Sequence, residues 1–141
     1  MKLFALAFIV AAIAAPAAFA KGRLTVAVSD TTPAASTPFT VTVRTDWVVP
    51  PKDWLRLIAV APGKGWYDVV GAVSGDSSTT HARVPHDGFE IKLVRVAPKT
   101  WRATVALPRP GRWRLVVPNG THLGFMLPPP TGWMPWVNVH A

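Results

Sequence analysis

Apolar and polar residues alternate along most of the chain with a period of two, which places successive side chains on opposite faces of a β-strand. The alternation is clearest at 24–28, 39–43, 89–96, 101–107 and 111–117. After residue 20, no window shows the 3.6-residue periodicity of a helix. The pattern therefore predicts short β-strands joined by turns.

Three further segments complete the predicted strands. The continuous apolar run 55–61 predicts a strand that is buried on both faces or lies centrally in its sheet. The run 66–73 is expected to pair with it. Residues 133–139 predict a last strand at a sheet edge, because Pro135 cannot donate a ladder hydrogen bond.

The segment 101–119 carries the strongest local signal. Two alternating runs flank Pro108, Pro110 and Gly111, which are typical turn residues. Such a pattern predicts a β-hairpin. We expect its apolar face, with Trp101 and Trp113, to belong to the core.

The opposite face of this predicted hairpin carries arginines. Arg102, Arg112 and Arg114 would form one positive patch, since cross-strand neighbours lie about 5 Å apart. The patch is a candidate docking surface for an anionic partner. The alternative is a solvated outer face whose charges oppose edge-to-edge aggregation.

Together the elements predict an all-β fold, a single antiparallel immunoglobulin-like β-sandwich of about seven to eight strands. The composition agrees, because 50% hydrophobic and 16% charged residues disfavour disorder. A length of 141 residues suggests one domain. The chain has no cysteine, which excludes thiolate metal sites and a cysteine nucleophile.

Residues 1–20 have the pattern of a secretory signal peptide. A basic start precedes an apolar run, and the small residues Ala18 and Ala20 stand at positions −3 and −1 of a cleavage site. We expect cleavage after Ala20, leaving 21–141 as an exported domain, periplasmic or secreted. The alternative is an uncleaved anchor, because 3–20 is apolar and uncharged.

Two stretches, 38–43 and 101–116, resemble the small extracytoplasmic immunoglobulin-like β-sandwiches of bacterial envelopes, of the YtkA/FixH-like kind. The resemblance implies a non-catalytic accessory or binding module, with no functional residues carried over. The chain also lacks a recognisable nucleophile elbow. The expected function is thus a non-enzymatic binding module of the cell envelope.

The formal net charge of +8 favours anionic partners. In an exported protein these are an anionic envelope polymer or an envelope protein rather than nucleic acid. Five of the seven tryptophans stand beside turns, where they would either form a binding platform or cover the ends of the sandwich. They are Trp47, Trp54, Trp66, Trp133 and Trp136.

No cofactor is expected, but copper handling is the alternative function. Imidazole and thioether groups suit copper, and methionine favours Cu(I). The candidate ligands are His122, Met126, Met134 and His140. Alternatively, the two methionines fill gaps in the core or cover an edge.

Overall fold

The computed structural model describes residues 23–49, 55–65, 84–118 and 134–141. These residues form eight strands and no helix, and hence none that could span a membrane. The strands are β1 (Leu24–Val28), β2 (Phe39–Thr45), β3 (Arg56–Val60), β4 (Phe89–Lys92), β5 (Val94–Ala97), β6 (Thr100–Val105), β7 (Gly111–Val116) and β8 (Trp136–Val139).

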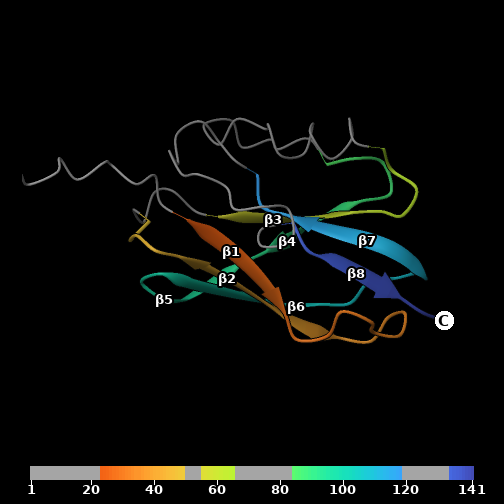
Figure 1. Cartoon of the computed structure of the whole chain (residues 1–141), viewed down its shortest axis with the longest axis horizontal. Helices are drawn as coiled ribbons and strands as arrows, with labels where there is room; N and C mark the ends of the chain where they lie inside the picture. The colour runs from red at the N-terminus through yellow and green to blue at the C-terminus, as the bar shows by residue number, and fades with distance from the viewer. Residues whose placement is uncertain (1–22, 50–54, 66–83, 119–133) are drawn as a thin grey trace, which may run out of the picture.

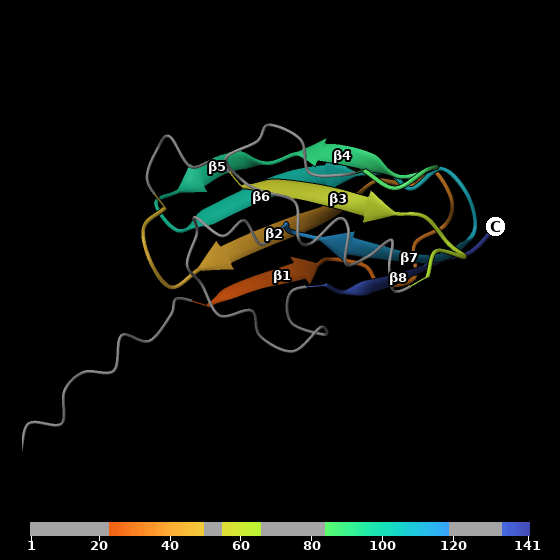
Figure 2. The same ribbon diagram turned by 90° about the horizontal axis from the view of Figure 1, so that it is seen from above.

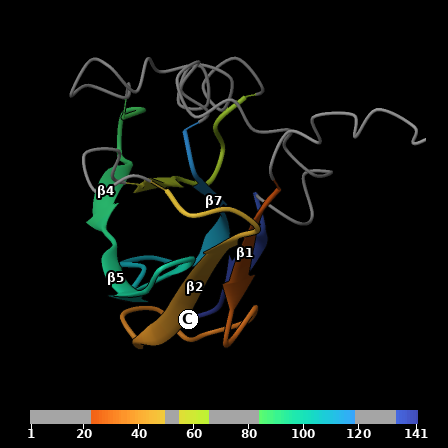
Figure 3. The same cartoon turned by 90° about the vertical axis from the view of Figure 1, so that its left-hand side faces the viewer.

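The strands form two four-stranded antiparallel sheets that pack as a β-sandwich (Figure 1). The first has the order β1-β2-β6-β5 and the second β4-β3-β7-β8. Figure 3 shows the two layers from the end of the sandwich. The all-β prediction is confirmed.

The core lies between the two sheets, where period-two alternation turns one apolar face of each strand inward. The first sheet contributes Val43 and Trp101, which are register partners, and the second contributes Trp113 and Leu115. All four are buried, so the assignment of both tryptophans to the core is confirmed.

The second sheet is also buried on its outer face along its two central strands. Ile58 and Val116 are register partners that face away from the core between the sheets, and neither is exposed. Val60, on the same outer face of β3, is buried as well. This confirms the prediction for 55–61, because β3 lies between β4 and β7 and is buried on both sides.

The hairpin predicted for 101–119 is wrong. Strand β6 pairs with β2 and β5, whereas β7 pairs with β3 and β8, so residues 106–110 lead from one sheet to the other (Figure 2). Two amphipathic strands can bury their apolar faces side by side or by facing each other across a core. Both arrangements give the same alternation, and here the chain crosses between the sheets with Leu107 of the connection buried in the core.

The strand predicted for 89–96 is divided in the structure. Strand β4 belongs to the second sheet and β5 to the first, with the half-buried Leu93 at the crossing between them. The alternation of apolar and polar residues continues through Leu93, so the sequence pattern does not indicate that 89–96 is divided between two sheets. Every residue of β5 is exposed, including Val94 and Val96, whereas the other edge strands β1, β4 and β8 each bury at least one residue.

Strand β8 is an edge strand that begins directly after Pro135, as predicted for 133–139. The predicted leader 1–20 and the predicted strand 66–73 lie outside the described residues.

Candidate functional site

Two arginines and a tryptophan meet on the outer face of the second sheet. Arg112 and Arg114 alternate along β7 with the core residues Trp113 and Leu115, so their side chains point away from the core. Trp136 on the neighbouring β8 is the register partner of Arg114. The guanidinium carbons lie 4.1 Å (Arg112) and 3.9 Å (Arg114) from the centroid of the Trp136 ring, within the range of cation–π attraction.

Arg114 is held firmly for a charged side chain. Only 8% of the residue is exposed, and its Nε donates a hydrogen bond to the backbone oxygen of Met134 at 3.1 Å. Burial, and then the charge of Arg112, lower the pKa of Arg114 below the usual arginine value. The group remains a cation at physiological pH, because arginine is protonated throughout that range.

These side chains line a cavity of about 130 Å³, here called the basic pocket. Lys64, from the turn that follows β3, adds a third cation. The remaining described lining residues are small or apolar: Val60, Ala61 and Gly63. Among the described residues, no carboxylate forms an ion pair with Lys64, Arg112 or Arg114. The basic pocket therefore concentrates positive charge that the described part of the chain does not neutralise.

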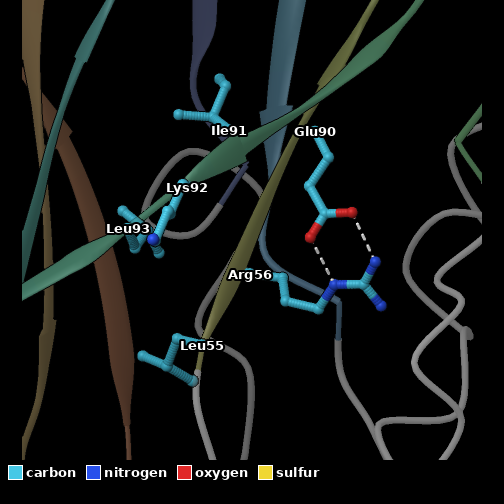
Figure 4. A pocket seen from close by; sticks show the side chains of 6 residues that line it. All are labelled: Leu55, Arg56, Glu90, Ile91, Lys92 and Leu93. Carbon is cyan, nitrogen blue, oxygen red and sulfur yellow. Dashed lines mark hydrogen bonds and ion pairs between the residues drawn. The ribbon is translucent and has the colours of Figure 1, made fainter.

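A second cavity of about 500 Å³ lies at the opposite edge of the same sheet (Figure 4). Its apolar wall consists of Leu55, Ile91 and Leu93. Arg56 and Glu90 reach toward one another from β3 and β4, with Nε–Oε1 at 2.6 Å and Nη2–Oε2 at 2.5 Å.

The Arg56–Glu90 pair is bidentate and neutralises itself. The hydrogen bonds from Arg56 lower the pKa of Glu90, and the same pairing raises the pKa of Arg56. Lys92 also lines this cavity and forms no ion pair with a described carboxylate, so one unpaired cation remains there, against three in the basic pocket. The second cavity therefore offers an anion less electrostatic attraction than the basic pocket does.

The single arginine patch expected from the sequence is divided between the sheets. Arg102 lies exposed on β6 in the first sheet, whereas Arg112 and Arg114 lie on β7 in the second. Arg114 is buried, whereas the alternative of a solvated outer face predicts an exposed side chain at this position. The physical reason is the crossing at 106–110, which separates strands that a hairpin would have placed side by side.

The predicted tryptophan platform is only partly within the described residues. Trp47 follows β2 and packs against the core, while Trp136 lies in the basic pocket. The structure thus assigns these two residues to different environments. Trp54, Trp66 and Trp133 lie outside the described residues.

Two of the four candidate copper ligands can be placed. The Met134 side chain is buried in the core, and His140 is exposed with its Nδ1 2.9 Å from the oxygen of Ala141. His122 and Met126 lie outside the described residues. Within the described part of the chain, no group of three or more His, Asp or Glu side chains is arranged to hold a metal ion.

Lys64 is a pocket residue that the sequence pattern does not indicate. Its segment, 62–65, reads only as a turn. The pairing of Val60 with Arg114 brings the end of β3 beside the arginines of β7. No local sequence signal could have indicated this neighbour, because the pairing joins residues far apart along the chain.

No protein-family model matches the sequence, no curated protein is significantly similar to it, and no solved structure significantly matches the fold.

Proposed function

We propose that this chain is a non-enzymatic, exported binding module of the cell envelope that binds an anionic partner through the basic pocket. The observation that carries the proposal is the meeting of Lys64, Arg112 and Arg114 around one cavity without a carboxylate partner among the described residues. Unneutralised cations in a recess attract anions and raise their local concentration.

The strand order supports an immunoglobulin-like module. In such domains one sheet has the order A-B-E-D and the other contains C, F and G, sometimes extended by C′. The sheets β1-β2-β6-β5 and β4-β3-β7-β8 correspond to A-B-E-D and C′-C-F-G when the strands are lettered in chain order. The signal-like sequence of residues 1–20 supports export.

The chemistry of the pocket favours binding over catalysis. Arginine guanidiniums remain protonated and cannot accept a proton from a substrate. The indole of Trp136 has no acid or base function at neutral pH. Lys64 is the one described lining residue with a side chain type that serves as a base or nucleophile, and no carboxylate or imidazole stands beside it among the described lining residues to assist such a role. Together these groups orient and hold an anion.

Binding of the purified protein to polyphosphate and polyglutamate would test the proposal. The variant Lys64→Gln/Arg112→Gln removes two pocket cations and keeps the buried Arg114. We expect it to bind these polymers at least about tenfold more weakly, because charge-assisted contacts contribute about 1 kcal/mol or more each. Isothermal titration at fixed salt provides the dissociation constants.

The matched control is Arg44→Gln/Arg102→Gln, which removes the same charge from the exposed face of the first sheet. This control should retain most of the affinity. Equal losses in the two variants would mean that net charge alone drives binding, and the proposal would be wrong.

A further inference from the structure

The basic pocket has a shape and donor arrangement that narrow the class of anion. We infer that it recognises a phosphate monoester group in preference to a carboxylate. The inference rests on the proposed function and names the ligand chemistry of the same site. It is carried by the orientation of the guanidiniums, the number of cations and the size of the cavity.

The orientation of Arg114 is set before any ligand arrives. Its Nε donates a hydrogen bond to the backbone oxygen of Met134, and its guanidinium carbon lies over the Trp136 ring, 3.9 Å from the ring centroid. Its two terminal nitrogens have no hydrogen-bond partner among the described residues. A fixed guanidinium presents these nitrogens as a fork that matches two oxygens of a phosphate.

The number of cations exceeds what a single carboxylate would use. Lys64 and Arg112 join Arg114 around a cavity of about 130 Å³. A carboxylate offers two oxygens and one negative charge, whereas a phosphate monoester offers three terminal oxygens and a charge of about −1.5 to −2 at neutral pH. Three cationic residues lining one small cavity match the charge of the monoester better than that of a carboxylate.

The indole of Trp136 holds the arginines rather than the ligand. Both guanidinium carbons lie within 4.1 Å of its ring centroid. Stacking on the indole also offsets part of the repulsion between the two arginines, which have no carboxylate between them. Recognition in this pocket is therefore directed at the charged group, not at a sugar or base stacked on tryptophan.

The test is a titration of the purified protein with glycerol phosphate, dimethyl phosphate and succinate, followed by the chemical shift of the Trp136 indole N–H. We expect saturable binding of glycerol phosphate, with succinate and dimethyl phosphate at least about tenfold weaker at pH 7.5. Lys64→Gln/Arg112→Gln should weaken glycerol phosphate binding about tenfold, and Arg44→Gln/Arg102→Gln should leave it nearly unchanged.

The pH dependence provides an independent readout. The charged groups on the described walls of the pocket are Lys64, Arg112 and Arg114, and no carboxylate or imidazole is among them. The second proton of a phosphate monoester leaves near pH 6, so its affinity should rise about fivefold between pH 5 and pH 7. A flat profile, or succinate binding as tightly as glycerol phosphate, would overturn the inference.

The two proposals fail in different ways. If both anionic polymers bind through the pocket but monoesters and succinate are equal, the proposed function stands and the phosphate inference is wrong. Vesicles containing phosphatidic acid or phosphatidylglycerol identify the source. Preference for phosphatidic acid supports a lipid monoester, binding of glycerol phosphate alone supports a soluble one, and binding of neither overturns the inference.

Discussion

At the scale of single residues, charged side chains in this protein occupy two different situations. Arg56 and Glu90 form a bidentate pair in which each charge satisfies the other. Arg112 and Arg114 are placed together with no acid between them among the described residues. The Arg56–Glu90 pair stabilises the folded protein. The repulsion between Arg112 and Arg114 lowers the stability of the folded protein, and a bound anion would restore it.

The Arg56–Glu90 pair predicts a pH-dependent contribution to stability. Because hydrogen bonds from Arg56 lower the pKa of Glu90, the contribution is present above the ordinary glutamate pKa and is lost as pH falls through the lowered value. Replacing Glu90 by Gln should cost about 1 kcal/mol of unfolding free energy at pH 7, a figure reduced for partial exposure of the carboxylate. Urea denaturation at pH 7 and pH 3 measures this.

The difference between Glu90→Gln and the unaltered protein should shrink at pH 3. Asp87→Asn is the control, since Asp87 is exposed and its contacts to His86 and Arg109 are 3.4 Å and 3.9 Å long. Its effect should stay within about 0.5 kcal/mol. A difference for Glu90→Gln that is the same at both pH values would contradict the assignment.

At the scale of elements, the connection 106–110 decides how the sandwich is assembled. Leu107 is buried within it, and the indole N–H of Trp113 donates to the backbone oxygen of Arg109 at 3.0 Å. Gly111 follows with φ of 129°, and an added Cβ there would lie 2.6 Å from Cγ of Pro62. The start of β7 therefore requires glycine for both its backbone conformation and its close approach to another turn.

Replacing Gly111 by Ala should destabilise the protein by about 3 kcal/mol, through backbone strain and the contact with the rigid Pro62 ring. Gly63→Ala is the matched control, because Gly63 also has positive φ, at 80°, but has open space around its missing Cβ. It should cost only about 1 kcal/mol. Thermal unfolding of both variants tests the difference, and equal costs would show that the Pro62 contact is unimportant.

At the scale of the whole molecule, the chain crosses between the sheets repeatedly, at Leu93 and at 106–110 among other places. Each sheet is completed by strands distant in sequence, and both sheets share one core. Separating the two sheets would expose the apolar inner face of each sheet to water, which is energetically unfavourable. We expect the sandwich to unfold as a single cooperative unit.

Truncating one buried leucine in each sheet tests this cooperativity. Leu24→Ala in β1 and Leu115→Ala in β7 should each lower the unfolding free energy by about 3 kcal/mol. Far-UV circular dichroism and tryptophan fluorescence should report the same shifted midpoint for each variant. Val94→Ala, at a residue that is 58% exposed, should change stability by less than about 0.5 kcal/mol. Separate transitions for the two probes would indicate sheets that unfold independently.

The candidate site shows which predictions were within reach of the sequence. The residue types and the alternation along their strand indicate Arg112 and Arg114, and the position of Trp136 beside a turn indicates that residue. Their meeting depends on β7 and β8 being neighbours, and the contribution of Lys64 depends on β3 pairing with β7. The separation of Arg102 from the other two arginines follows from the same pairings.

By itself, the sequence determined most of the strand positions and the side of most amphipathic strands that faces the core, because a period-two alternation separates apolar from polar side chains irrespective of the neighbouring strand. The break at Leu93 and the burial of Arg114 and Val116 on the outer face were decided by the tertiary structure.

Only the tertiary structure decided which strands pair. Two amphipathic strands bury the same apolar side chains whether they pair within one sheet or face each other from two sheets. The pattern at 101–117 is therefore compatible with a hairpin and with a crossing between sheets. Contacts between residues distant in sequence, such as the approach of Pro62 to Gly111, exist only in the folded molecule. The observed strand pairing brings the two arginines, Trp136 and Lys64 into one pocket.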